Sequence, residues 1–383
     1  MRCLMQLLLS AILLTGWPAT LFSQFRIEMP YTEENGKLIV EAEVNGCAGR
    51  FILDTGAPCA LSHLFIKKMG KAEGQTATFQ DSNGNLVNSQ IVQIESLLLG
   101  GTRFSQLQAV ALPEGNIVET FRIDGVIGYN LFRMGSLRLN GRKHTAMFSS
   151  ESVVEAADSS HATPLVKDPY LTLIPVGIGE SARDTVMFDC GASGFYTLSD
   201  RSYARMKHEK APLKLLGSGC GTLSAGVAGV ENQTLKHRLC IPQFDLCQSP
   251  FQNLTTITTS APNSRIGTGF LAYGDMAIDF RQGLFYFLPY ETEKAPDLYQ
   301  PEWNAVIVAA QGKLIIGMVW NTQHTPLRGG EQIVEINGTS YANGIDTYQA
   351  VTHGIIPTLA HKLSIKYIDP ASGKIRSTVI RKK

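Results

Sequence analysis

The sequence has almost no net charge and few charged residues of either sign. Its 383 residues include 34 Lys and Arg against 33 Asp and Glu, and only 17% of the residues are charged. Nucleic-acid binding depends on an excess of basic residues that attracts phosphates, so no nucleic-acid partner is expected. No long run of like charges indicates a solvated tail either.

Several motifs of enzyme chemistry are also missing. The 7 Cys include no Cys-x-x-Cys pair and the 8 His show no metal-ligand spacing, so neither a metal nor another cofactor is expected. No Gly-x-Ser-x-Gly motif indicates a serine hydrolase. The glycine-rich run 217–221 lacks the Lys-Ser/Thr of a phosphate-binding loop, and we interpret it as a hairpin tip.

The first 23 residues are typical of a signal peptide. Arg2 supplies a positive charge, residues 4–14 are apolar, and no other charge occurs in the segment. The alternative is an uncleaved membrane anchor, although a Gly and a Pro interrupt a continuous spanning helix. In both cases the protein is expected to be exported, which means periplasmic, at the cell surface or secreted. Export permits disulfides, so Cys240 and Cys247 either pair across a hairpin or stay free.

The most informative feature is a short pattern that occurs twice. One apolar run ends in Asp54-Thr55-Gly56-Ala57, and a second ends in Asp189-Cys190-Gly191-Ala192. Each Asp follows a strand-like segment and precedes a Gly that permits a sharp turn. Two such turns in similar halves can bring two carboxylates face to face.

A second repeated element lies downstream of each motif. Val126-Ile127-Gly128 follows the first and Arg265-Ile266-Gly267 follows the second, and apolar residues and glycines recur after both at identical spacing. A lone Asp-x-Gly arises by chance, whereas two copies with matching downstream elements indicate a duplicated unit. Alternating apolar stretches and 36 Gly favour β structure over helix.

These motifs resemble those of the aspartic peptidases, the pepsin and retropepsin group, over roughly residues 28–290. The resemblance implies a mainly β fold, a two-lobed aspartic-peptidase-like pair of β-barrels, with lobes expected at 24–150 and 163–290 and a polar linker between them. It also implies an aspartic endopeptidase that acts on polypeptide substrates, with Asp54 and Asp189 as the catalytic residues.

In that family two neighbouring carboxyl groups hydrolyse a peptide bond through an activated water. They share one proton because both cannot ionise side by side, so the pair supplies a base for the water and an acid for the carbonyl oxygen. The proton belongs to the pair, and the sequence does not assign acid and base to individual residues.

The resemblance also gives the residues around the two aspartates a role in supporting the dyad. These are Thr55, Gly56, Ala57, Cys190, Gly191 and Ala192. Thr55 matches the hydroxyl residue with which the family links its lobes, but Cys190 departs from it, since a thiol is a weak hydrogen-bonding group. The alternative function is therefore a catalytically inactive peptide-binding protein of the same fold.

Residues 76–92 predict a hairpin with a polar tip, at the position in the chain where the family has the flap that covers its cleft. A plain surface hairpin is the alternative. The flap candidates are Phe79, Asp81, Ser82, Asn83 and Gly84.

The internal repeat stops before the last segment, residues 302–383. Residues 327–338 resemble the signature stretch of bacterial PDZ domains, which implies a small PDZ-like α+β domain there. PDZ domains capture peptide tails by adding them as a strand to a sheet edge, so a peptide tail is a further expected partner. The loop that binds the peptide carboxylate would precede a strand at 314–316.

Overall fold

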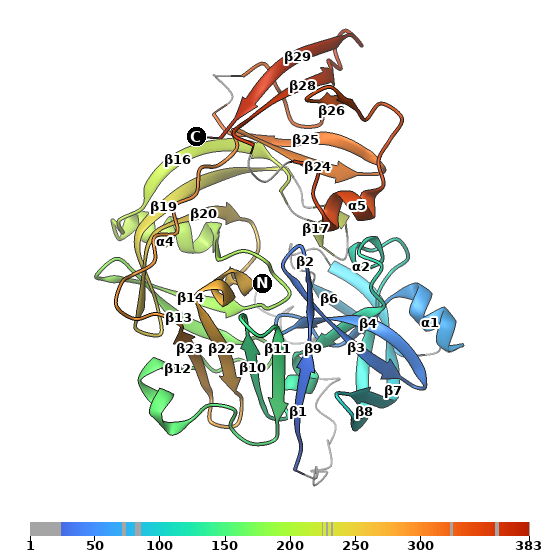
Figure 1. Cartoon of the computed structure of the whole chain (residues 1–383), viewed down its shortest axis with the longest axis vertical. Helices are drawn as coiled ribbons and strands as arrows, with labels where there is room; N and C mark the ends of the chain where they lie inside the picture. The colour runs from blue at the N-terminus through green and yellow to red at the C-terminus, as the bar shows by residue number, and fades with distance from the viewer. Residues whose placement is uncertain are drawn as a thin grey trace, which may run out of the picture.

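The computed structural model describes residues 24–70, 74–80, 86–223, 225–226, 229–230, 233–321, 325–356 and 360–382. The predicted signal peptide lies outside these residues. Within them, no helix has both the length and the apolar character needed to cross a bilayer. The fold is mainly β, with two barrels, a sheet that joins them and a C-terminal unit (Figure 1).

The first half forms a closed ring of six strands. In order around the ring they are β3 (Lys37–Val44), β4 (Cys47–Asp54), β9 (Gly125–Gly128), β5 (Ala60–Leu61), β8 (Thr102–Ala111) and β7 (Leu86–Leu99). Pairing of β7 with β3 closes the ring, and β2 (Thr32–Glu34) and β6 (Thr76–Gln80) extend it. Asn45 and Gly46 connect β3 to β4 with φ of 49° and 83°, the conformation of a tight hairpin turn.

The second half repeats this ring strand for strand. Its order is β13 (Leu173–Ile178), β14 (Ala182–Phe188), β21 (Ser264–Ile266), β15 (Tyr196–Ser199), β20 (Ser249–Thr259) and β19 (Thr234–Leu246), and β19 pairs back onto β13. The parallel and antiparallel pairings match those of the first ring. The repeated sequence pattern therefore corresponds to a repeated barrel.

In each barrel a helix follows a short ring strand, β5 in the first barrel and β15 in the second. In the first, α1 (His63–Met69) is N-capped by Ser62, and in the second, α4 (Asp200–His208) is N-capped by Ser199. The remaining helical turns of the two halves are α2 (Ile117–Thr120), α3 (Tyr129–Phe132), η1 (Ala156–His161) and η2 (Thr268–Ala272).

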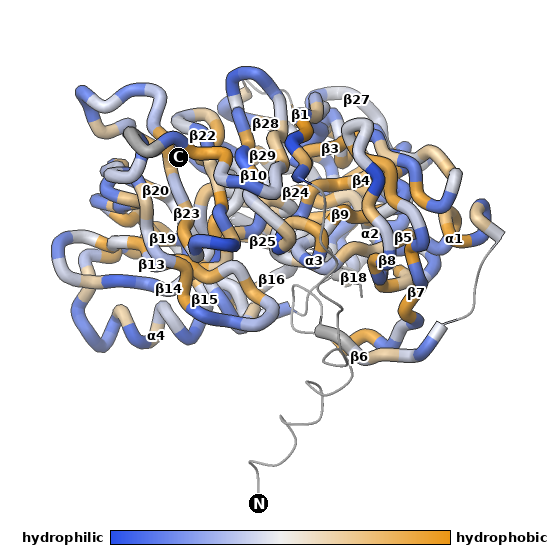
Figure 2. Tube along the Cα trace, turned by 90° about the horizontal axis from the view of Figure 1, so that it is seen from below, coloured by the Kyte–Doolittle hydropathy of each residue, from blue (hydrophilic) through white to orange (hydrophobic). Residues whose placement is uncertain are grey.

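A six-stranded sheet joins the two barrels. Its order is β1 (Arg26–Pro30), β11 (Thr145–Ser149), β10 (Ser136–Asn140), β22 (Gly274–Asp279), β23 (Leu284–Pro289) and β12 (Ala162–Pro164). The first three strands come from the first half, and β10 pairs with β22 across the boundary. The apolar residues gather on the strands while many outer turns are hydrophilic (Figure 2), and one large core cluster contains residues of both halves.

The glycine-rich run 217–221 is not a hairpin tip, contrary to the sequence interpretation. It lies in β16 (Lys214–Gly221), which pairs with β19 and, at Gly221, with β25 (Lys313–Val319) of the C-terminal unit. A Cβ at Gly219 would lie 2.2 Å from the carbonyl oxygen of Val319, and one at Gly221 2.4 Å from that of Gly317. The glycines thus permit a close approach between the second barrel and the C-terminal unit.

The C-terminal unit has its own apolar core, which includes Leu314, Ile333 and Leu363. Its elements besides β25 are β24 (Ala305–Ala310), β26 (Gln332–Ile336), β27 (Thr339–Ser340), α5 (Thr347–Thr352), β28 (Lys362–Ile368) and β29 (Ile375–Arg381). The strand at 314–316 is hydrogen-bonded to β24 and β26, so it has no free edge for a peptide. Within the described residues β24 pairs with β25 alone. A short hairpin of β17 (Ala225–Gly226) and β18 (Gly229–Val230) lies between β16 and β19.

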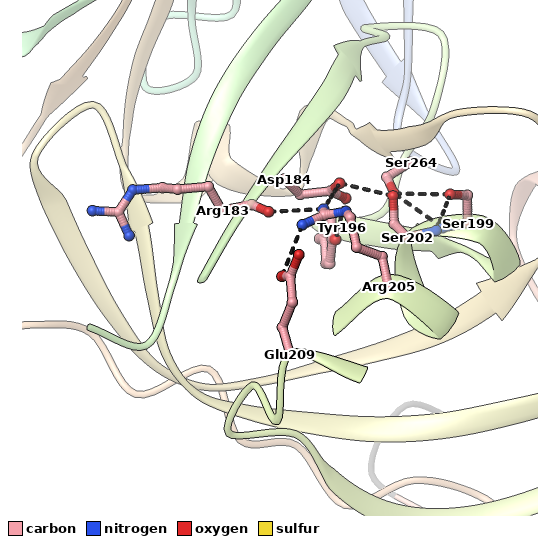
Figure 3. Close-up of polar contacts among 8 residues, drawn as sticks. All are labelled: Arg183, Asp184, Tyr196, Ser199, Ser202, Arg205, Glu209 and Ser264. Atoms are coloured by element: carbon pink, nitrogen blue, oxygen red, sulfur yellow. Dashed lines mark hydrogen bonds and ion pairs between the residues drawn. The ribbon is translucent and has the colours of Figure 1, made fainter. Parts of the chain in front are cut away.

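A buried carboxylate fixes α4 to the second barrel (Figure 3). Asp184, only 4% exposed, accepts hydrogen bonds from the hydroxyls of Tyr196 and Ser202, both at 2.8 Å. Arg205 donates to the same carboxylate at 3.1 Å and also pairs with Glu209 at 3.1 Å on the exposed face of the helix. Three donors from two other elements therefore depend on one acceptor on β14.

We expect Asp184→Ala to lower the free energy of unfolding by about 3 kcal/mol, because it leaves buried donors without an acceptor. Glu209→Ala is the matched control: it removes another partner of Arg205, but in an exposed pair, and should cost about 0.5 kcal/mol or less. Urea denaturation of the two variants measures both values. Similar losses would mean that the buried network contributes no more than a surface pair.

Candidate active site

The two Asp motifs lie at equivalent places in the two barrels and face each other. Asp54 ends β4, and Asp189 directly follows β14. A Cβ at Gly191 would lie 2.3 Å from Asp54 Oδ2, and one at Gly56 would lie 2.9 Å from Asp189 Cγ. Each glycine thus allows the backbone to approach the opposite carboxyl group. Each carboxyl group therefore lies against the glycine of the opposite motif, and the charge of Asp189 acts on Asp54.

The residues after the aspartates link the two halves. The Thr55 hydroxyl accepts from the backbone N–H of Cys190 at 3.1 Å and donates to the Phe188 carbonyl at 2.8 Å. The Cys190 thiol donates to the Leu53 carbonyl at 3.3 Å. The thiol therefore occupies the place of the expected hydroxyl and makes a contact of the same kind, although a weaker one.

The alanines of the two motifs are tied to the downstream elements. The carbonyl of Ala57 accepts from the backbone N–H of Tyr129 at 2.8 Å, and that of Ala192 accepts from the N–H of Thr268 at 2.8 Å. Strand pairing also aligns Asp54 with Gly128. The predicted supporting residues are thus brought together around the two carboxyl groups.

Two further residues connect the halves at the site, and sequence analysis did not identify them. The Lys37 ammonium group, on β3, donates to the carbonyl of Gly191. The Thr268 hydroxyl lies 3.0 Å from the carbonyl of Gly36 and 3.2 Å from that of Ala192. Nothing in the sequence near Lys37 indicates this contact, because its partner lies in the other half of the chain.

Arg265 is the third residue that was missed as a site residue. Its Nη1 lies 3.7 Å from Asp189 Oδ2, with side chains only 15% and 10% exposed. The first barrel has Val126 at the same position of its downstream element. The sequence did contain a signal for this residue, because Arg265 is a charged residue in an element that is otherwise apolar.

The electrostatics of the pair favour retention of a proton. Burial, followed by the charge of Asp189, raises the pKa of Asp54 from 3.8 to about 7. The Gly56 N–H, which donates to Asp54 Oδ1 at 2.7 Å, and the Lys37 charge act in the opposite direction. Burial also raises the pKa of the Cys190 thiol, which therefore stays neutral. The pair accordingly carries one proton up to nearly neutral pH.

The flap candidates are only partly within the described residues. Phe79 lies on β6, opposite Val87 of β7 in the hairpin register. Asp81, Ser82, Asn83 and Gly84 lie outside the residues that the structure describes. The flap therefore stays a prediction.

The described residues contain neither a cluster of metal ligands nor a disulfide. No group of three or more His, Cys, Asp or Glu side chains in them is placed to hold a metal ion. The six cysteines in the described part of the chain are all free thiols, Cys240 and Cys247 among them.

The pKa of Asp54 predicts how stability depends on pH. Because the folded state binds this proton more tightly than the unfolded state, the resulting stabilisation is complete below pH 4 and is lost as the pH rises through about 7. Asp54→Asn removes this dependence, so its stability relative to the parent should increase between pH 4.5 and 7.5, by about 1.4 kcal/mol for each pH unit at most. Thermal unfolding at several pH values tests this, with Asp200→Asn on the exposed start of α4 as control. A difference that does not change with pH would contradict the assignment.

One comparison with known proteins, a match to a family model, agrees with this chemistry for the first half. A family model described as aspartyl protease matches residues 40–131, which include the first Asp motif and its downstream glycine. No curated protein matches the chain significantly. A solved retropepsin-like aspartic protease from Rickettsia conorii is similar over 33% of this chain and 91% of its own length, with 18% identity and a TM-score of 0.26. The family match supports an aspartic peptidase.

Proposed function

We propose that this protein is an exported aspartic endopeptidase whose catalytic dyad is Asp54 and Asp189. The observation that carries the proposal is the placement of two carboxyl groups from equivalent strands, each against the glycine of the other motif. The aspartyl protease match over residues 40–131 supports the same chemistry. Export rests on residues 1–23 alone, and N-terminal sequencing of the protein from separated cell fractions tests it.

The reaction follows from one proton shared by the two carboxyl groups. The ionised carboxyl takes a proton from a water molecule as the water oxygen attacks the peptide carbonyl carbon. The protonated carboxyl gives its proton to the carbonyl oxygen, and the resulting diol collapses when the amide nitrogen is protonated and the C–N bond breaks. Thr55 and Cys190 hold the two halves in the geometry that this exchange needs.

We also propose that residues 302–383 are a PDZ-like domain that binds a peptide tail. Two features support this: β24 has no second partner among the described residues, and α5 packs against it. An extended peptide added to β24 would extend the sheet of the C-terminal unit. Ile307→Pro in the whole chain should weaken peptide-tail binding, because it changes the β24 backbone while leaving the dyad intact. Unchanged binding would exclude this edge.

We expect residues 24–383 to cleave casein or a peptide library, with inhibition by pepstatin and a loss of activity as the pH rises above about 7. Asp54→Asn and Asp189→Asn should each reduce kcat by ~1,000-fold or more without loss of folding, whereas Asp200→Asn should behave like the parent. Peptide binding without cleavage in the parent would favour an inactive peptide-binding protein. Wild-type turnover in either dyad variant would disprove the dyad.

A further inference from the structure

The two repeated halves differ in charge at one position beside the dyad. Val126 on β9 and Arg265 on β21 are equivalent. In the parallel pairing Val126 lies opposite Ile52 and Arg265 lies opposite Met187, and each partner is two residues before the aspartate of its motif. Val126 is buried in an apolar cluster, whereas Arg265 directs its guanidinium group to Asp189. At this position of the repeat the residue is therefore apolar in the first half and cationic in the second.

We propose that Arg265 makes Asp189 the ionised member of the pair, so that Asp189 is the base and Asp54 the acid. This inference rests on the proposed function. Arg265 acts through Asp189 and is a positioning residue. Its guanidinium group lies 3.7 Å from the carboxylate with little exposure of either side chain, so solvent screens their attraction less than on the surface.

The other groups that face the pair leave this assignment in place, although the Lys37 charge acts against it. In the described part of the chain, they are the Lys37 ammonium group from β3, the Cys190 thiol and the Gly56 N–H. The ammonium group donates to the Gly191 carbonyl, and its charge lowers the pKa of Asp54 less than burial raises it. The thiol is neutral. In the proposed assignment Asp54 keeps the proton and Asp189 carries the charge.

The assignment gives each proton a direction. Asp189 accepts a proton from water as the new C–O bond forms, and Asp54 transfers its own proton to the carbonyl oxygen as the C=O π bond opens. When the diol collapses, Asp189 gives its proton to the amide nitrogen, the C–N bond breaks, and Asp54 recovers a proton from a hydroxyl of the diol. The pair returns to its starting state, and Arg265 stabilises the negative charge throughout the resting state.

Variants with a single aspartate separate the effects on the two carboxyl groups. With ¹³C-labelled aspartate, NMR follows Asp189 in Asp54→Asn and Asp54 in Asp189→Asn. Adding Arg265→Gln should raise the apparent pKa of Asp189 by about one unit or more and change that of Asp54 much less. Arg265→Lys keeps the charge and should return the apparent pKa of Asp189 most of the way to its value with Arg265. If Arg265→Gln does not fold, Arg265→Met is used in its place. Equal shifts at both sites, or none, would overturn the proposal.

Kinetics supply the second arm of this test. With both aspartates present, Arg265→Gln should move both limbs of the pH profile of kcat/KM upward by about one pH unit, because the pair loses a neighbouring cation. An unmoved profile would also overturn the proposal. The NMR titrations do not require turnover, so failure of the proposed function and failure of this assignment are distinguishable.

A different observation concerns α5 of the C-terminal unit. Val351 packs against an apolar cluster of the first barrel, which contains Ile52 and contacts Ala57. Beside it, the Arg122 guanidinium group lies 4.1 Å from the ring of Tyr348 and 3.7 Å from Asp346. Figure 1 shows α5 on the side of the C-terminal unit that faces α2 of the first barrel. The unit thus contacts the wall of the first barrel that continues to Asp54.

The contact of the same unit with the second barrel is more extensive. Besides the pairing of β16 with β25, Arg238 donates twice to the Trp303 carbonyl at 3.1 Å and stacks on Trp320 at 4.2 Å. The Arg122 pair, in contrast, has side chains that are 63% and 52% exposed. Exposed pairs contribute little, so the contact of α5 is the one that opens more easily.

We infer that α5 bridges to the first barrel as a gate beside the dyad and that long substrates are cleaved faster when it is released. This inference too rests on the proposed function. Arg122→Ala and Val351→Asp should raise kcat/KM for casein by about two- to five-fold, a factor that corresponds to loss of a weak surface contact. Arg142→Ala is the matched control, since Arg142 stacks on Tyr290 at 4.0 Å and pairs with Glu291 at 3.9 Å away from α5.

Hydrogen exchange tests the contact without reference to turnover. Amides of α5 and α2 should exchange faster in Arg122→Ala and Val351→Asp than in the parent or in Arg142→Ala. Unchanged exchange would show that α5 is not held there. Faster exchange with unchanged or lower casein cleavage would show that the contact does not restrict access, and would overturn the gate.

Discussion

The structure depends on two carboxyl groups held side by side and largely out of water. Burial disfavours their charge and their mutual repulsion disfavours a second charge, so the pair does not hold itself together. The backbone must impose the contact. Gly56 and Gly191 permit the approach, and the hydrogen bonds of Thr55 and Cys190 connect the two halves directly behind the carboxyl groups. The pairing of β10 with β22 in the joining sheet fixes the position of the two barrels relative to each other.

The features that sequence analysis predicted are those that neighbouring residues determine. The two Asp motifs are visible because each requires an apolar strand, an acid and a glycine in direct succession, and the equal spacing downstream reflects equal barrels. Mainly β structure followed from the same patterns. The structure adds a repeated local feature that sequence analysis did not predict, a serine, Ser62 or Ser199, that caps the helix after the short strand of each barrel.

The features that it missed depend on residues far away in the chain. The run 217–221 has the composition of a turn, and its pairing with β19 and, at Gly221, with Met318 makes it a strand. Lys37 reaches a carbonyl in the other half of the molecule, and no local pattern encodes that contact. Arg265 was visible as a charge in an apolar element, but its distance from Asp189 follows from how β14 and β21 pair.

A duplicated fold presents a difficulty for acid–base chemistry, because equivalent positions give equal environments whereas the two carboxyl groups need different protonation states. The differences between the halves at the site are few: Thr55 against Cys190, Val126 against Arg265, and Lys37 of β3, whose charge acts on Asp54. The first exchanges a hydroxyl for a thiol, and both of these hydrogen-bonding groups are neutral. The second adds a formal charge within 4 Å of one carboxylate. The interaction energy of two charges with little solvent exposure is much larger than the difference in hydrogen-bond energy between a hydroxyl and a thiol. In the proposed mechanism, the asymmetry between the two carboxyl groups therefore arises mainly at Arg265.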